Sequence, residues 1–303
     1  MSDKWPKRPR VLEPNSGYVR RTEGGFTLSA SSLAEFEAST TRIRVDGVNI
    51  AFRTWGDGPP LVLVHGLGAN SLLWIKQLDA LGASHRLIAV DLRGFGQSDR
   101  PRAAGAYTID RFADDIVTLV RELGIGKIDY LGTSMGGFIG QALALKAPEL
   151  INRLILAHTA AQMTMPLSIL EKRLAVLREL PMSEFSKLVG AQALADGVDS
   201  PEFGWLCQMI ERNDPDVYAQ VLGEGLSGFD LRSQVDQIRL PTLVIVGDKD
   251  RVIPPEGGYA LAEAIAGARL ASLTGVGHIG YAEQPQAFNR HVLGFLDIAV
   301  SKT

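Results

Sequence analysis

Residues 130–137 read Tyr-Leu-Gly-Thr-Ser-Met-Gly-Gly and contain the pattern Gly-x-Ser-x-Gly around Ser134. A serine hydroxyl attacks a carbonyl group only when it projects from the backbone beside amides that can receive the developing negative charge. A sharp turn from a strand into a helix provides this geometry. Because the turn crowds the serine, the residues two before and two after it must lack a Cβ atom, and here they are Gly132 and Gly136. The stretch predicts a nucleophilic serine; an ordinary glycine-rich turn with a solvated serine is the alternative.

The sequence on both sides of this motif favours the first interpretation. Residues 127–131 have the apolar content of a short strand, and residues 138–147 have that of a buried helix that stops near Pro148. Strand, turn and helix therefore follow one another in the order that the motif needs.

An acid and a base for this serine come later in the chain, in the order serine, acid, histidine. A strand-like run at residues 241–246 leads into a loop that holds Asp248 and Asp250, and we assign the acid to Asp250. A second strand-like run at residues 269–273 leads into a glycine-flanked loop that holds His278. We assign the base to His278.

The remaining histidines are weaker candidates for the base, since a single histidine is more often structural or solvated than catalytic. His85 precedes a strand in a polar turn, and His291 lies in a helical pattern near the C-terminus. His158 ends the strand pattern at residues 154–157, but no carboxylate close to it in sequence could orient it. Only His278 combines position, order and an acid partner.

Donors for the oxyanion are predicted where a buried strand runs into a glycine turn at residues 60–68. The backbone N–H groups of Leu67 and Met135 are the candidates. Losing one such donor typically costs about 3 kcal/mol of transition-state stabilisation, whereas the identity of the side chain matters little. We interpret His65 in this turn as a structural hydrogen-bonding residue and not as a second base.

The motifs together resemble those of the α/β-hydrolase superfamily. They are His-Gly-Leu-Gly at residues 65–68, Asp-Leu-Arg-Gly-Phe-Gly-Gln-Ser-Asp at residues 91–99, the turn at Ser134, and the pair Asp250 and His278. The resemblance extends over about residues 41–300. It implies a mostly parallel eight-stranded sheet with helices on both faces, a triad of Ser134, Asp250 and His278, and a structural role for residues 91–99.

The acid loop also resembles that of the superfamily. Its spacing is Gly247-x-x-Asp250-x-x-x-Pro254, in which the second aspartate is the orienting group. The resemblance therefore favours Asp250 over Asp248. Glu283, five residues after His278, is a remote alternative.

The strand signals fall into two blocks, separated by a helical insertion. Strands are predicted at residues 42–45, 48–54, 61–65, 86–90, 128–131, 153–157, 240–246 and 269–273. Between the strand at residues 153–157 and the strand at residues 240–246, helical patterns occur at residues 167–180, 184–195, 202–212 and 217–226. We therefore divide the chain into an extension at residues 1–40, a core at residues 41–161 and 234–303, and a helical cap at residues 162–233, inserted after the sixth strand.

The cap is expected to cover the carboxyl ends of the strands, where sheets of this kind bind their ligands. Candidates for the substrate pocket are the large apolar and aromatic side chains of the cap, two or three of which should touch the ligand while the others pack the cap against itself. They are Met163, Met165, Leu170, Phe185, Leu188, Trp205, Met209 and Tyr218.

The serine in this strand-to-helix turn, the nucleophile elbow of the superfamily, indicates the reaction class. Haloalkane dehalogenases and epoxide hydrolases of this superfamily carry aspartate there, whereas serine implies acyl transfer through an acyl-enzyme. The substrate is then an ester, a lactone, a thioester or an activated carbon–carbon bond. A hydrolase-fold receptor that only binds its ligand is the alternative from another functional class.

Smaller motifs favour carboxylesterases and 3-oxoadipate enol-lactonases within the superfamily. Similar segments are His-Thr-Ala-Ala at residues 158–161, Gly-Phe-Asp-Leu-Arg at residues 228–232 and Pro-Thr-Leu-Val-Ile at residues 241–245. The C–C hydrolases that act on ring-cleavage dienones share the Ser-Met-Gly-Gly elbow, but they commonly have tryptophan after the catalytic histidine, and this chain has Ile279.

The apolar cap also suggests a substrate preference. No cluster of arginines is apparent that would hold a dicarboxylate in bidentate fashion, so neutral esters and lactones are expected to be better substrates than charged ones. Arg173, Arg178 and Arg212 are the cap arginines that could fold inward and reverse this order.

Composition sets the remaining bounds. The 303 residues are 46% hydrophobic, enough for one large domain with an insertion, and the formal charge of −3 gives no reason to expect nucleic acid. Cys207 is the single cysteine, so an internal disulfide is excluded, and neither a metal site nor another cofactor is expected. No apolar run long enough to span a bilayer and no secretory signal are found, which favours the cytoplasm. The basic extension predicts no function, and the sequence predicts no oligomeric state.

Overall fold

The computed structural model describes residues 30–163 and 166–297, which form a single eight-stranded sheet flanked by helices. The strand order is β1-β2-β4-β3-β5-β6-β7-β8, in which β2 runs antiparallel to both of its neighbours, β1 and β4, and the other neighbouring pairs are parallel. The strands are β1 (Thr41–Val45), β2 (Val48–Trp55), β3 (Pro60–Val64), β4 (Arg86–Asp91), β5 (Ile128–Thr133), β6 (Ile151–Ala157), β7 (Thr242–Gly247) and β8 (Arg269–Leu273). The predicted fold is confirmed, and no strand end differs from its expected position by more than two residues.

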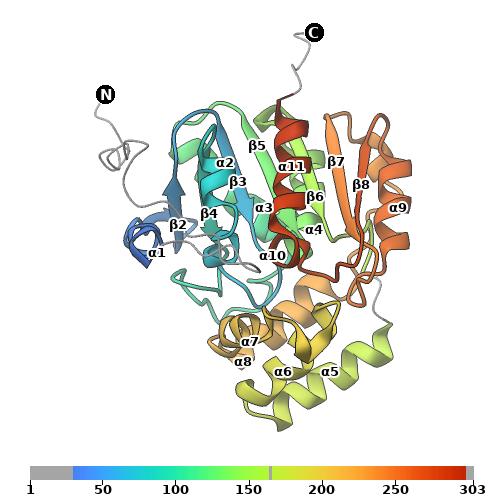
Figure 1. Ribbon diagram of the computed structural model, residues 1–303. Coiled ribbons are helices and arrows are strands. Elements are labelled where there is room, and N and C mark those ends of the chain that lie inside the picture. The colour runs from blue at the N-terminus through green and yellow to red at the C-terminus, as the bar shows by residue number, and fades with distance from the viewer. Residues whose placement is uncertain (1–29, 164–165, 298–303) are drawn as a thin grey trace.

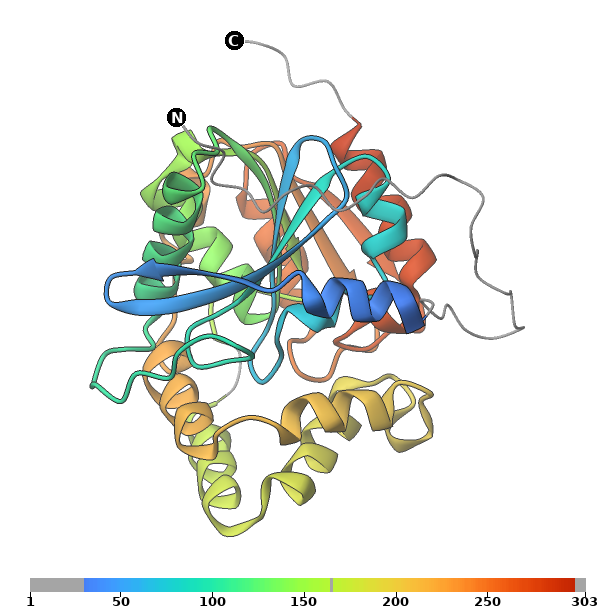
Figure 2. The same cartoon turned by 90° about the vertical axis from the view of Figure 1, so that its left-hand side faces the viewer.

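Helices cover both faces of the sheet (Figures 1 and 2). One face carries α2 (Leu78–Gly82) and α11 (Pro285–Leu296); the other carries α3 (Ile109–Glu122), α4 (Met135–Lys146) and α9 (Pro255–Ala264). The short α10 (Gly280–Glu283) precedes α11. Because both faces are covered, β5 and β7 are buried along their whole length, which is why they appear in the sequence as continuous apolar runs without alternation.

The first helix, α1 (Ala30–Ala38), lies within the segment predicted to be an N-terminal extension. Its Phe36 is completely buried and packs edge-on against Trp55 of β2, with ring centroids 6.3 Å apart. The end of the predicted extension is therefore packed on the core, and residues 1–29 lie outside the described residues.

The segment predicted to form a cap, called the cap below, contains α5 (Leu167–Glu179), α6 (Met182–Ala193), α7 (Phe203–Glu211), α8 (Pro215–Gln220) and a π-helical segment at Val221–Leu226. These helices lie together below the end of the sheet in Figure 1. Two chain segments close the base of the cap: the Met163 N–H donates to the Phe229 carbonyl at 2.8 Å, and the Leu231 N–H donates to the Ala161 carbonyl at 2.7 Å. The chain thus enters and leaves the cap through two segments that are hydrogen-bonded to each other.

None of the helices within residues 30–163 and 166–297 combines the length and the apolar composition that are needed to cross a membrane.

Candidate active site

The turn that carries Ser134 joins β5 to α4 with one residue between them. Ser134 has φ 55° and ψ −118°, a conformation that L-residues rarely adopt. A Cβ atom on Gly132 would lie 2.2 Å from the Gly136 carbonyl oxygen, and one on Gly136 would lie 2.3 Å from the Val64 carbonyl oxygen. Glycine at both positions is therefore a steric requirement, as the sequence pattern predicts.

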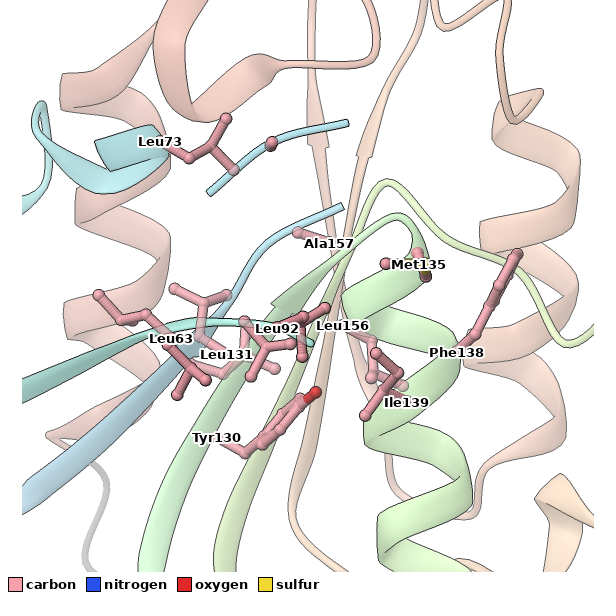
Figure 3. Packing of buried hydrophobic residues seen from close by; sticks show 14 of the residues in the cluster. Leu63, Leu73, Leu92, Tyr130, Leu131, Met135, Phe138, Ile139, Leu156 and Ala157 are labelled. Carbon is pink, nitrogen blue, oxygen red and sulfur yellow. The ribbon is translucent and has the colours of Figure 1, made fainter. Parts of the chain in front are cut away.

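Hydrogen bonds hold this strained turn in place. The Ser134 N–H donates to the Ala157 carbonyl at 2.9 Å, and the Thr159 hydroxyl donates to the Ser134 carbonyl at 3.0 Å. The Tyr130 hydroxyl donates to the Gly136 carbonyl at 2.7 Å. Figure 3 shows Tyr130 between its strand and α4, with Met135 and Phe138 on that helix beside the turn. The surrounding structure thus fixes a conformation that the serine would not adopt alone.

Asp250 and His278 lie in two loops that leave neighbouring strands at the same edge of the sheet. Nδ1 of His278 lies 2.7 Å from Oδ2 of Asp250, and Oδ1 of Asp250 accepts hydrogen bonds from the N–H groups of Val252 and Ile253 at 2.8 and 2.9 Å. Burial disfavours the charged carboxylate, but the imidazole groups of His278 and His158 outweigh it and hold the pKa of Asp250 far below its ordinary value. The carboxylate therefore stays ionised and oriented toward His278.

The two other carboxylates considered for this role bind backbone instead. Oδ1 of Asp248 accepts hydrogen bonds from the Gly275 and Val276 N–H groups at 2.7 and 3.2 Å, and so ties the acid loop to the histidine loop. Glu283 accepts from the Gly277 N–H at 2.9 Å and from the cap residue Ala195 at 2.8 Å. Neither carboxylate forms an ion pair with His278.

His158 lies closer to this centre than the sequence indicates. Its ring is completely buried, with Nδ1 3.7 Å from Oδ2 of Asp250 and its centroid 6.0 Å from that of His278. Burial lowers the pKa of His158, so the ring is neutral near pH 7. Asp250 lies far from His158 in the sequence, which is why the sequence around His158 shows no carboxylate partner for it.

The backbone beside Ser134 offers the two candidate oxyanion donors. Among the described residues, neither the Leu67 N–H nor the Met135 N–H donates a hydrogen bond. A Cβ atom on Gly66 would lie 3.0 Å from Cβ of Ser134, so the loop before Leu67 passes very close to the serine. Backbone N–H groups without partners are uncommon in protein interiors, and both of these groups could donate to an oxyanion that develops at the serine.

His65 fixes the shape of this loop. Its Nδ1 lies 2.7 Å from the Gly66 carbonyl oxygen, and its Nε2 accepts a hydrogen bond from the Leu92 N–H at 3.0 Å. Burial lowers the pKa of His65, which favours the neutral ring that these two contacts need. Both ring nitrogens are engaged, so His65 has the contacts of a structural residue.

A cavity of about 840 Å³, its mouth included, connects the serine turn with the cap. Ser134 and His278 both line it, although no hydrogen bond joins the Ser134 hydroxyl to the His278 ring. The side chains that the cap contributes are mostly aliphatic. Together with Met163, just before the first cap helix, they are Arg173, Val189, Ala193, Leu206, Ile210, Tyr218, Leu222 and Leu226.

The structure separates the eight candidate pocket residues into those that line the cavity and those that do not. Of the eight candidates, Met163 and Tyr218 line the cavity, and Met165 lies outside the described residues. The other five, which do not line it, are Leu170, Phe185, Leu188, Trp205 and Met209. Size and apolarity select residues that pack inside the cap as readily as residues that face a ligand, and Leu188 is 56% exposed.

The lining residues that were missed follow a helical spacing. Val189 and Ala193, Leu206 and Ile210, and Leu222 and Leu226 are pairs four residues apart. Such pairs lie on one face of a helix. A search for aliphatic pairs at this spacing would have been the better signal in the sequence.

The three arginines of the cap differ in their position relative to the cavity. Arg173 lines the cavity, whereas Arg178 and Arg212 are exposed and do not.

Comparisons with known proteins agree with this architecture. A family model described as the alpha/beta hydrolase fold matches residues 59–201, and one described as TAP-like protein matches residues 229–299. The chain is 30% identical over 255 residues to a putative carbamate hydrolase, RutD, of Rhizobium rhizogenes, an alignment that covers 79% of this chain and 93% of that one.

Enol-lactonases are similar in both sequence and structure. The chain is 33% identical over 250 residues to 3-oxoadipate enol-lactonase 2 of Acinetobacter baylyi, covering 81% of this chain and 92% of that protein. The crystal structure of the enol-lactonase from Burkholderia xenovorans matches with a TM-score of 0.80 and 31% identity, over 85% of this chain and 100% of that chain. By sequence and fold alike, the protein belongs to the α/β-hydrolase superfamily and to its enol-lactonase-like branch.

Proposed function

We propose that this protein is a serine hydrolase that cleaves carboxylic esters or lactones through an acyl-enzyme on Ser134. The observation that carries the proposal is the 2.7 Å contact between Asp250 and Nδ1 of His278, at the edge of the cavity that Ser134 lines. With Nδ1–H donating to the carboxylate, Nε2 of His278 has the free electron pair of a general base.

The reaction follows from the roles of these groups. His278 removes the proton from the Ser134 hydroxyl as the oxygen attacks the substrate carbonyl, and the N–H groups of Leu67 and Met135 donate to the resulting oxyanion. Collapse of the tetrahedral intermediate breaks the ester bond, and the proton on His278 passes to the leaving alcohol. His278 then deprotonates a water molecule that hydrolyses the acyl-enzyme and releases the acid.

Two alternative functions, a C–C hydrolase and a ligand receptor, account for fewer of these features. Cleavage of a carbon–carbon bond would use the same serine, but Ile279 stands where C–C hydrolases commonly carry tryptophan. A receptor that binds its ligand without turnover would keep the cavity, yet it would have no need for two unpartnered amides beside an accessible serine. The ester or lactone reaction uses all of these features.

The test is to label the folded protein with a fluorophosphonate, which reacts with activated serines, and to repeat the labelling with Ser134→Ala. We expect labelling of the wild type and none of the variant, and a loss of esterase activity of about 10³-fold or more. The variant should remain folded, because alanine removes only an oxygen from a turn whose glycines remain. Substantial activity in the purified variant, or no labelling of the wild type, would contradict the proposal.

A turnover panel then separates the reaction classes. It should include p-nitrophenyl esters of increasing acyl length, neutral lactones, the oxoadipate enol-lactone and a ring-cleavage dienone. The proposal expects turnover of esters or lactones, whereas a clear preference for the dienone would favour the C–C hydrolase.

A further inference from the structure

Three loops carry groups that the proposed reaction uses, and the cap is hydrogen-bonded to each of them. They are the oxyanion loop at residues 65–69, the acid loop at residues 248–254 and the histidine loop at residues 274–279, together called the catalytic loops below. The hydrogen bonds come from the end of α6 and from the turn between α7 and α8. The cap is therefore joined to the catalytic loops themselves as well as to the rest of the core.

The end of α6 is completed by two of these loops. The last carbonyl groups of a helix have no partner within that helix and need one elsewhere. Here the Ala193 carbonyl accepts from the backbone N–H of His278 at 2.7 Å, and the Ala191 carbonyl accepts from the Arg251 guanidinium at 2.9 Å. Arg251 directly follows Asp250 in the chain, and Ala193 also lines the cavity. One helix end thus holds the loops of both the proposed base and the proposed acid.

Glu283 fastens the histidine loop to the same part of the cap. One of its carboxylate oxygens accepts from the Ala195 N–H at 2.8 Å, and the other accepts from the Gly277 N–H at 2.9 Å. A Cβ atom on Gly277 would lie 2.6 Å from the Ala193 carbonyl oxygen, so the two backbones are in direct contact. Because each oxygen accepts from one N–H, the carboxylate fixes the distance between cap and loop. Glu283 therefore sets the position of the residue directly before His278.

Asn213 makes the corresponding contact with the oxyanion loop. Its side-chain amide donates to the Gly68 carbonyl at 2.7 Å and to the Ile210 carbonyl in α7 at 2.8 Å. A Cβ atom on Gly68 would lie 2.7 Å from the ring of Tyr218, so this loop also touches the cap directly. Gly68 follows Leu67, whose N–H is a candidate oxyanion donor. A cap side chain thus holds the residue next to that donor.

We infer that Glu283 and Asn213 are positioning residues that couple the position of the cap to the geometry of the catalytic loops. This inference rests on the proposed function, because it makes the cap responsible for the orientation of His278 and of the Leu67 N–H. The cap then takes part in the reaction in addition to covering the cavity. A displacement of α6 would move the base, and misplacing a reacting group by about 1 Å can cost about 10²-fold in rate.

The first pair of variants tests the contact of Glu283. Glu283→Gln preserves the shape of the side chain but leaves one acceptor oxygen for two N–H groups. The control is Glu224→Gln, because Glu224 lies in the cap and accepts from the N–H of the core residue Gly105 at 3.1 Å, outside the catalytic loops. Both substitutions weaken a hydrogen bond between a carboxylate and a backbone N–H across the boundary of cap and core, but only the first alters the histidine loop.

The second pair tests Asn213 in the same way. Asn213→Ala removes the hydrogen bond to the Gly68 carbonyl. The control Gln220→Ala removes a hydrogen bond from a cap amide to the Ala103 carbonyl at 3.0 Å, again outside the catalytic loops. The two contacts involve separate loops, so each pair decides the role of its own residue, and either pair is sufficient if a variant of the other does not fold.

Steady-state kinetics with p-nitrophenyl butyrate measures the effect on catalysis. Glu283→Gln and Asn213→Ala should each lower kcat by about tenfold and change KM by less than about threefold, since the loops act on the transition state. Both controls should stay within about twofold of wild type. Titration of the active sites with a fluorophosphonate corrects kcat for unfolded enzyme and so separates positioning from a loss of stability.

Hydrogen exchange followed by mass spectrometry gives a readout that does not depend on turnover. Exchange should rise by about threefold or more in the histidine loop of Glu283→Gln and in the oxyanion loop of Asn213→Ala, and in neither control. If wild type hydrolyses no ester but exchange changes in this way, the proposed reaction is wrong and the coupling of cap to loops stands. If esters are hydrolysed and the test variants match their controls in kcat, or if exchange in the loops is unchanged, the inference is wrong.

Discussion

The serine turn and the cap differ in what fixes the positions of their functional groups. In the turn, the backbone conformation fixes the position of the serine: Ser134 has a positive φ, and a Cβ atom would not fit at the neighbouring glycines. In the cap, the rotation of each helix decides which side chain faces the ligand. The first kind of constraint is visible in a short sequence pattern, whereas the second depends on how helices pack.

The cap residues show how small the difference can be. Val189, Leu206 and Ile210 line the cavity, and each is the residue directly after a candidate chosen for size, namely Leu188, Trp205 and Met209. One residue along a helix is a rotation of about 100°, which is enough to move a side chain from the ligand to the interior of the cap or to solvent. The serine turn has no such ambiguity, because its glycines must stand two residues before and two residues after the serine.

The largest effect is expected where two carboxylates lie two residues apart. Asp250→Asn should lower kcat by about 10³- to 10⁴-fold, because an amide cannot hold the His278 ring in the required tautomer as a carboxylate does. Asp248→Asn should cost far less, since that side chain binds only the Gly275 and Val276 backbone. Steady-state kinetics with one ester would measure both. Equal losses would mean that the acid has been assigned to the wrong residue.

A glycine in each region gives the next comparison. Gly136→Ala should destabilise the protein by about 3 kcal/mol or more, because its Cβ would lie 2.3 Å from the Val64 carbonyl oxygen. Gly204→Ala in α7 of the cap has open space around its Cβ and should be neutral or stabilising by up to about 1 kcal/mol. Chemical denaturation would measure both changes. Similar free energies of unfolding for the two variants would contradict the steric argument.

Adjacent cap residues test the role of helix rotation. Val189→Ala should enlarge the cavity and shift the preferred acyl chain, with a change of about tenfold in the ratio of kcat/KM for long and short esters. Leu188→Ala should leave that ratio within about twofold, because the Leu188 side chain is mostly in solvent. A p-nitrophenyl ester series would measure the ratio. A larger change in the Leu188 variant would show that the cavity is lined differently.

The smallest effect concerns stability in mild acid. Burial is the main cause that lowers the pKa values of His65 and His158 below the ordinary 6.5. In mild acid, the unfolded chain therefore binds more protons at these two residues than the folded chain does. Asp91 opposes the shift at His65; at His158 Asp250 opposes it and His278 adds to it. Stability should therefore be full above pH 6.5 and fall below it, by up to about 1.4 kcal/mol per pH unit for each histidine.

His158→Asn gives the control for this slope. Denaturation midpoints between pH 7.5 and 5.5 should show a shallower pH dependence in the variant, whatever its stability at pH 7.5. An unchanged slope would mean that His158 does not contribute.

Much of the core was predictable from sequence. The Gly-x-Ser-x-Gly pattern has one steric solution, buried parallel strands require continuous apolar runs, and the order of Ser134, Asp250 and His278 follows the strands that carry them. These rules are local, because each depends on the backbone conformation of a few consecutive residues. They were enough for the fold and for the candidate triad.

Tertiary structure alone decided which distant groups meet. It brings His158 to within 3.7 Å of Asp250, although no carboxylate is near it in sequence, and it turns Arg173 into the cavity while Arg178 on the same helix faces solvent. A side chain's surroundings depend on helix rotation and on loops from remote parts of the chain, and neither leaves a local pattern. The sequence by itself therefore determined the fold and the candidate catalytic residues, and the packing of the cap on the sheet decided the electrostatics of the cavity in which they would act.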